Sequence, residues 1–178
     1  MKTYLVYGFG MSAVGFLLQL VLFILGYHSD VEKFGQGQWI AGVAGIVIAV
    51  AAIVLGTKVK RAAGPEESGF SYGQAVGAGV MISLFAAILD VVLNYVYVTF
   101  INTGFTDIMV QSQMAKAQAK GAGPEQLEQM EKGIRFMAAP VPNAVMVIVM
   151  MMIFGTIISL IVAAFLKRPA HDQAASAQ

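Results

Sequence analysis

The chain has 178 residues, of which 58% are hydrophobic and only 12% carry a formal charge. Soluble domains carry about 25% charged residues, so this composition excludes an ordinary water-soluble protein. The net charge of +1 argues against general nucleic-acid binding, and a sequence without cysteine has no disulfides and no thiolate metal sites.

Four long stretches are almost free of charge. Asp, Glu, Lys and Arg are absent from residues 3–29, 34–57 and 136–166, and residues 68–106 contain only Asp90. A helix needs about 20 apolar residues to cross a hydrocarbon core roughly 30 Å thick. The sequence therefore predicts an all-α integral membrane four-helix bundle (residues 1–168), with spans at residues 4–27, 38–57, 74–101 and 141–166 and a disordered tail at residues 169–178, which holds His171.

Residue types near the predicted span ends favour the same topology. Aromatic rings that prefer the headgroup region lie close to these ends, namely Tyr4, Tyr7, Trp39, Tyr95 and Tyr97. Pro140 and Pro142 lie at the start of the fourth span, where a missing N–H is harmless.

The distribution of basic residues predicts the orientation. One end of the spans holds short basic clusters: Lys2, Lys58, Lys60, Arg61, Lys167 and Arg168. The other end holds Lys33, Lys116, Lys120, Lys132 and Arg135, mostly in the long segment 102–139, where acidic residues dilute them. Basic residues close to the spans stay in the cytoplasm. We therefore expect both termini in the cytoplasm and segment 102–139 outside it, as an extracytoplasmic insertion between the third and fourth spans.

This insertion is predicted to be helical. Residues 106–120 form a polar helix, Gly121 and Gly123 break it, and Pro124 begins a second helix. The second helix has an apolar stripe at helical spacing, formed by Leu127, Met130, Ile134 and Met137. Such a stripe lies on the membrane surface, covers the bundle or meets a protein partner. Covering the bundle is the default, because apolar helix faces usually pack on their own fold.

Each predicted span also carries a row of small residues. These rows are Gly8, Ser12 and Gly15; Ala41, Gly45, Ala49, Ala52 and Gly56; Ala75, Gly79, Ser83, Ala86 and Ala87, with the Gly73–Gly77 pair beside them; and Gly155, Ser159 and Ala163. Close approach at small residues drives helix packing in lipid. The rows predict tight packing, either within one chain or in a homo-oligomer.

Asp90 is the one acid inside a predicted span. At 1.5 Å per residue it lies roughly 4 Å from the midplane, and Gln19 of the first span has nearly the same depth. Asn94 follows one turn later on the same face. A charged Asp there costs about 2.5–3.5 kcal/mol, and no span offers a cation, so a neutral acid is expected.

Two interpretations of this polar cluster of Asp90, Asn94 and Gln19 stay open. The cluster is either an ion or proton site, or a polar clasp between helices worth about 0.6 kcal/mol per hydrogen bond. The clasp is favoured, because a proton relay usually needs more than one acid and a water path.

Other motifs favour structural roles. Methionines in the fourth span and the outer segment are interpreted as packing residues and not as Cu(I) ligands. His28 and Asp30 are expected in a solvated loop, because two ligands do not make a metal site. With no buried histidine expected to serve a triad, we predict no catalytic residue, no metal site and no cofactor.

Two stretches carry a family resemblance. Residues 70–75 (FSYGQA) lead into the third span, and residues 157–168 (IISLIVAAFLKR) end the fourth. Together with the polar insertion, they resemble small bacterial four-helix membrane proteins of domain-of-unknown-function family four-one-nine-nine, over about residues 4–168. The resemblance implies four spans in a bacterial inner (plasma) membrane and no established activity.

The sequence thus predicts a non-enzymatic, membrane-embedded protein that binds other proteins or serves as a scaffold for them. Its expected partners are the lipid bilayer and, in addition, a second copy of itself bound through the small-residue helix faces or an extracytoplasmic protein. The alternative is an oligomeric small transporter or channel subunit with a proton or ion site at Asp90.

Overall fold

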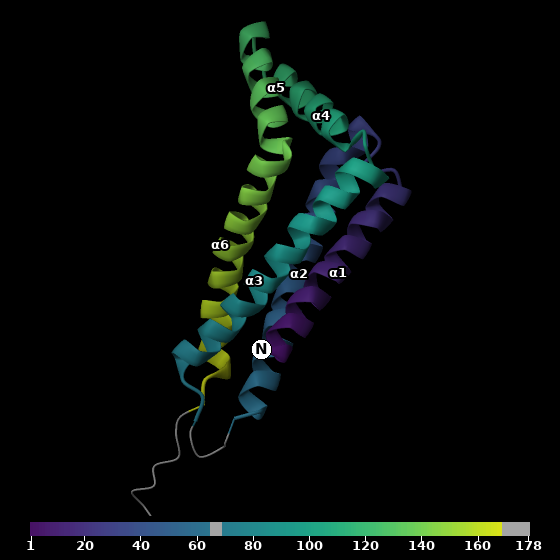
Figure 1. The fold of residues 1–178 in the computed structure, drawn as a ribbon. Coiled ribbons are helices and arrows are strands. Elements are labelled where there is room, and N and C mark those ends of the chain that lie inside the picture. The colour runs from purple at the N-terminus through teal and green to yellow at the C-terminus, as the bar shows by residue number, and fades with distance from the viewer. Residues whose placement is uncertain (65–68, 169–178) are drawn as a thin grey trace, which may run out of the picture.

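The structure is a computed structural model that describes residues 1–64 and 69–168 (Figure 1). The predicted tail and His171 lie outside the described residues. Within the described ranges the chain forms six α-helices and one π-helix, η1. Their bounds are Lys2–Ile24 (α1), Val31–Ala62 (α2), Tyr72–Val96 (α3), Tyr97–Ile101 (η1), Phe105–Ala119 (α4), Pro124–Ala138 (α5) and Pro140–Leu166 (α6).

The predicted all-α class is confirmed for the part of the chain that the structure describes. Four helices are long and apolar enough to cross a membrane: α1, α2, α6 and the continuous stretch Tyr72–Ile101, which joins α3 and η1. Their exposed faces are rich in large apolar side chains, as a lipid surrounding requires.

The largest difference from the predicted boundaries concerns α2. Its predicted range was residues 38–57, but the helix begins at Val31 and ends at Ala62. It begins early because the Asp30 carboxylate accepts hydrogen bonds from the backbone N–H groups of Glu32 and Lys33. A cap of this kind starts a helix in polar sequence, before the apolar run begins. Likewise α1 ends at Ile24, ahead of Gly26, whose φ of 85° ends the helix.

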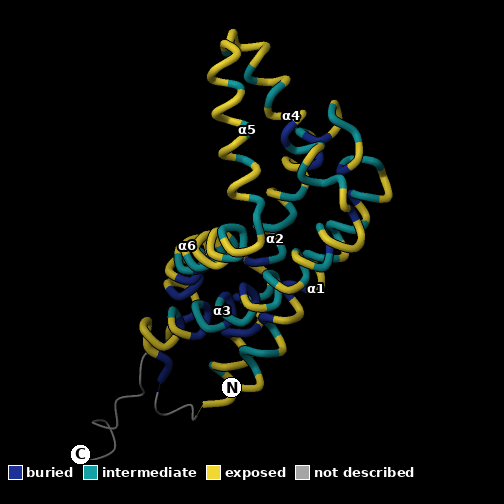
Figure 2. Tube along the Cα trace, turned by 45° about the horizontal axis from the view of Figure 1, so that its top comes forward, coloured by how far each residue is buried: buried dark blue, intermediate teal, exposed yellow. Residues whose placement is uncertain are grey.

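Helix α3 lies at the centre of the spans and packs against α1, α2 and α6. The start of α1, the end of α2, the start of α3 and the end of α6 gather at one end of the molecule (Figure 1). Helices α4 and α5 lie at the opposite end. In Figure 2 the buried residues follow the inner faces of the spans, whereas α5 is almost wholly exposed.

Small residues join α3 to α6 in a reciprocal arrangement. A Cβ at Gly79 would overlap the Ser159 side chain, and a Cβ at Gly155 would overlap the Ser83 side chain. Each serine hydroxyl donates to the carbonyl of the glycine four residues earlier in its own helix. The rows of small residues in α3 and α6 therefore pack against each other within one chain. Gly73 and Gly77, in contrast, have open space where a Cβ would lie.

The stretch before α3 is tied to the end of α6. Phe70 and Arg168 exchange two backbone hydrogen bonds, both 2.8 Å long. Ser71 caps α3 in a capping box with Gln74, and the Tyr72 hydroxyl donates to the Leu160 carbonyl at 3.1 Å. The two stretches that carry the family resemblance are therefore in direct contact with each other.

Candidate functional site

The structure brings the three predicted polar residues to one cavity. Gln19 of α1 and both Asp90 and Asn94 of α3 line a cavity of about 250 Å³. All three side chains are half-buried. The rest of the wall is apolar and is formed by Gly15, Phe16, Leu93 and Val147.

The hydrogen bonds at this cavity differ from those expected for a polar clasp, in which the three side chains would bond to one another. In the described part of the chain, no hydrogen bond joins the side chains of Gln19, Asp90 and Asn94 to one another. The Asp90 carboxyl instead interacts with the Ser12 hydroxyl. Ser12 donates its one O–H to the Ala86 carbonyl at 2.8 Å, which leaves its oxygen able to accept a hydrogen bond from the protonated Asp90 carboxyl. The amides of Gln19 and Asn94 thus keep hydrogen-bonding capacity that faces the cavity.

A second polar cluster, which the sequence did not predict, surrounds His28 in the connection between α1 and α2. His28 is only 3% exposed, and its Nδ1 lies 2.8 Å from the Tyr97 hydroxyl. The Asn102 amide donates to this hydroxyl at 3.1 Å and to the His28 carbonyl at 3.0 Å. We call these three residues, His28, Tyr97 and Asn102, the His28 cluster.

Aromatic rings enclose the His28 cluster. The His28 ring lies 5.2 Å from the Phe105 ring and 6.2 Å from the Phe34 ring, centroid to centroid. The Phe23 ring packs edge-on against Tyr97. The cluster therefore joins the connection between α1 and α2 to the π-helix and to the first turn of α4.

Three expectations are wrong at this point. His28 does not lie in a solvated loop, and the premise that no histidine is buried fails with it. Tyr97 is 0% exposed and is not a ring of the headgroup region. One physical reason explains all three errors. Helix α4 folds back over the connection between α1 and α2, and its Phe105 ring covers His28 and Tyr97.

The π-helix η1 helps to place Tyr97 and Asn102 together. The Asn102 N–H donates to the Tyr97 carbonyl at 2.7 Å, which is a bond to the fifth residue back and not the fourth. The wider turn changes the direction in which the following side chains point, and such turns are frequent at functional sites. Tyr97, the first residue of η1, and Asn102, which directly follows η1, are both buried, whereas Ile101 between them is exposed.

Burial also shapes the chemistry of His28. It lowers the pKa of the imidazole below its ordinary value, and no neighbouring charge contributes to the shift. Its Nε2 is buried and has no hydrogen-bond partner within the described residues. The neutral ring is therefore the form that suits this surrounding.

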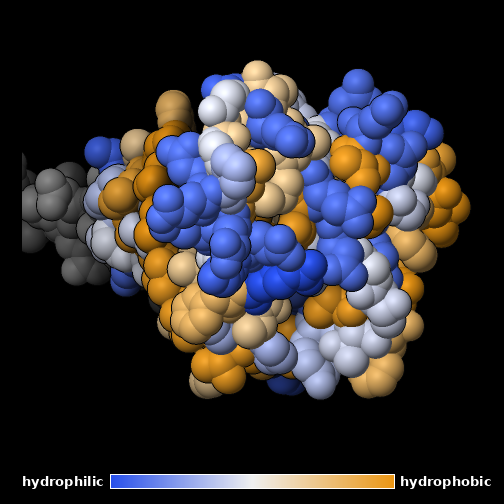
Figure 3. Space-filling view, turned by 90° about the horizontal axis from the view of Figure 1, so that it is seen from above, coloured by the Kyte–Doolittle hydropathy of each residue, from blue (hydrophilic) through white to orange (hydrophobic). Residues whose placement is uncertain are grey.

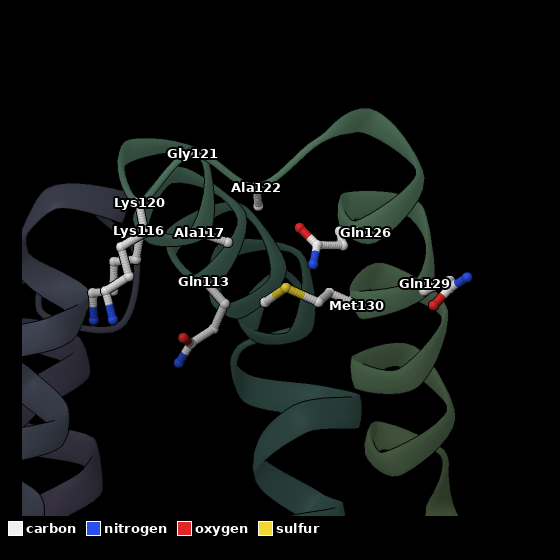
Figure 4. Close-up of a pocket in the computed structure, with 9 residues that line it drawn as sticks. All are labelled: Gln113, Lys116, Ala117, Lys120, Gly121, Ala122, Gln126, Gln129 and Met130. Atoms are coloured by element: carbon white, nitrogen blue, oxygen red, sulfur yellow. The ribbon is translucent and has the colours of Figure 1, made fainter.

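Two further cavities are lined by α4 and α5, the second together with the start of α6. The first is polar, and Figure 4 shows Met130 and Gln126 of α5 pointing toward α4. The ammonium groups of Lys116 and Lys120 turn instead toward α2, and Lys116 Nζ lies beside Gly35. The second is an apolar groove of about 500 Å³, which we call the α5 groove. It is lined by Met109, Gln113, Met130, Gly133, Ile134, Met137, Ala138, Asn143 and Met146.

Comparison with known proteins gives one positive result. No curated protein and no solved structure matches the chain. A family of proteins of unknown function matches it over residues 6–168, a range that contains both stretches of the resemblance and their contact at Phe70 and Arg168. The chain belongs to this family, DUF4199.

Proposed function

We propose that the protein is a non-enzymatic interaction protein of the bacterial inner membrane. In this proposal residues 1–168 form one four-span membrane domain with both termini in the cytoplasm. Segment 102–139, which contains α4 and α5, is an extracytoplasmic insertion. The positions of the basic clusters near the spans support this orientation.

The observation that carries the proposal is the exposed apolar face of α5. None of the residues of α5 is buried, although its apolar stripe is well formed. Met137 is 48% exposed, and Leu127 and Ile134 are half-buried. An apolar face that its own fold leaves uncovered typically marks an interaction site.

The direction of α5 favours a protein partner over the membrane surface. Figure 1 shows α5 continuing upward from α6, so that it projects beyond the end of the spans. A helix that lies on a membrane would instead run across the span ends. Helix α5 packs against α4 and α6, and its stripe faces the α5 groove. We infer that an apolar segment of an extracytoplasmic protein binds in this groove.

The charged residues of α5 surround the apolar stripe with polar surface. Lys132 pairs with Glu128 at 2.6 Å, and Arg135 pairs with Glu131 at 2.9 Å and with Asp107 of α4 at 2.8 Å. Seen from above, hydrophilic side chains cover much of this end of the molecule, with apolar patches between them (Figure 3). A small apolar patch inside a polar rim is the usual anatomy of a protein interface.

Photo-cross-linking in membranes tests this function. A benzophenone amino acid at Met137, inside the α5 groove, should give one protein adduct of fixed mass. Ile134→Glu places a charge in the groove and should reduce that adduct at least tenfold, because burying an unpaired charge is costly.

The matched control places the same probe at Lys132, on the charged side of α5. It should give no such adduct. Equal adducts from both positions, or an adduct that Ile134→Glu leaves unchanged, would contradict a specific interaction through the groove.

A second function is favoured by the cavity at Asp90. An acid and two amides with hydrogen-bonding capacity to spare line a cavity between helices of membrane-spanning length, and such residues often mark ion or proton sites. In this case the other subunits of a homo-oligomer would supply the rest of the path for the ion or proton through the membrane. Purified protein in liposomes should then carry protons, and Asp90→Asn should abolish the flux. Equal flux with Asp90→Asn, or none in the parent protein, rejects this candidate.

A further inference from the structure

We propose that the His28 cluster is a pH-sensitive latch, which holds α4 on the spans while His28 is neutral and releases it when His28 is protonated. The inference concerns how α4 is attached, and it does not depend on a partner for α5. It rests on the hydrogen bonds, the ring contacts and the burial of the cluster.

The latch joins segments that are distant in sequence. His28 and Tyr97 are 69 residues apart, yet their side chains share a hydrogen bond. Phe105 of α4 contacts the rings of His28, Phe34 and Tyr97, with centroid distances of 5.2 to 5.6 Å. The first turn of α4 is therefore docked on this cluster, and a change in the cluster acts directly on α4.

The cluster accommodates a neutral imidazole better than a cation. Nδ1 has the Tyr97 hydroxyl as its partner, but Nε2 has no partner in the described structure whichever nitrogen carries the proton. A cation has an N–H at both nitrogens, so one N–H would be left unpaired among aromatic rings. Leaving a charged donor unpaired in an apolar surrounding is unfavourable.

Charged groups on the surrounding helices do not offset this cost. The titratable group that contacts His28 is the phenol of Tyr97. At the start of α2, Asp30 caps the helix and lies 3.8 Å from Lys33, and Glu32 is exposed. On α4, Asp107 pairs with Arg135.

The direction of the pH effect follows from burial. Because burial lowers the pKa of His28 in the docked state, the released state binds a proton more readily. Docking is then strongest above the ordinary histidine pKa of about 6.5 and weakens as the pH falls below it. The ratio of released to docked α4 should rise by up to about tenfold per pH unit in that window.

Spin-label distances test the latch. The native chain has no cysteine, so cysteines at Gln36 of α2 and Gln118 of α4 label specifically. In lipid nanodiscs at about pH 7.5 the distance distribution should be narrow, and at about pH 5 it should become longer and broader. A reference pair at Gln36 and Lys58, both on α2, should not change.

Variants decide whether His28 is the sensor. His28→Phe keeps an aromatic ring that does not titrate, and it should hold the distribution narrow at both pH values. His28→Gln provides a second non-titrating side chain if that variant does not fold. His171→Gln, at the other histidine of the chain, should keep the full response. The proposal is overturned if the parent protein shows no lengthening at low pH, or if both non-titrating variants still respond.

Discussion

Gly79→Leu should prevent α3 from packing closely on α6 and should lower the free energy of unfolding by about 1–3 kcal/mol, the usual range for an overpacked core. The glycine faces the Ser159 side chain and Ile53, and any Cβ there would overlap both. Helices in lipid gain nothing by hiding apolar surface from lipid, so close approach is a main source of their association. The measurement is unfolding of the purified protein by sodium dodecyl sulfate, followed by circular dichroism.

Gly77→Leu is the matched control for this change. Gly77 lies in the same helix, is exposed and has open space where a Cβ would lie. It should leave the midpoint of unfolding nearly unchanged. If the two leucine variants unfold together, the reciprocal packing of Gly79 with Ser159 and of Gly155 with Ser83 does not stabilise the protein.

Phe34→Ala should cost about 3–5 kcal/mol, the range for removing a fully buried aromatic ring. Phe34 is 1% exposed and supports both His28 and Phe105. Its loss leaves a cavity below the first turn of α4, so α4 should become sensitive to added protease before the spans unfold. Unfolding midpoints and the rate of cleavage within α4 measure the two effects.

Phe136→Ala removes the same ring from α5, where Phe136 is 64% exposed. This control should change stability by less than about 0.5 kcal/mol, as surface substitutions usually do. A Phe34→Ala variant that is as stable and as protease-resistant as Phe136→Ala would show that the aromatic cluster does not hold α4 in place.

The four apolar helices were predictable because length and composition alone define a helix that can cross a membrane. Gaps between charged residues located all four apolar helices, and Pro124 and Pro140 correctly marked the starts of α5 and α6. The start of α2 was not predictable from the same signal. Asp30 begins that helix in polar sequence, and a search for apolar runs does not detect a cap.

The cavity at Asp90 was partly predictable for a geometric reason. The rise per residue placed Gln19 at nearly the same depth as Asp90, and both line one cavity in the structure. The partner of Asp90 was not foreseen, although Ser12 and Gln19 are seven residues apart and therefore share a face of α1. The depth of a residue in the membrane says which residues lie at the same level. It does not say which side chain of α1 contacts Asp90 of α3.

The His28 cluster was not predictable from local patterns. It depends on a contact between His28 and Tyr97, which are 69 residues apart, and on a π-helix. Neither feature produces a recognisable pattern of residue types in the sequence. The only local signal was a histidine with aromatic residues nearby, at Phe23 and Phe34. That signal does not distinguish a buried ring from a solvated one until α4 is seen to fold over it.

We expect the chain to cross a bilayer four times, with the connection between α1 and α2 on the same side as α4 and α5. Single cysteines at exposed Ser29, Lys60 and Gln118 test it, because the native chain has none. A membrane-impermeant maleimide added to intact cells should label the Ser29 and Gln118 positions, and the Lys60 position only after the membrane is opened. Equal labelling of the Lys60 and Gln118 positions in intact cells would contradict this topology.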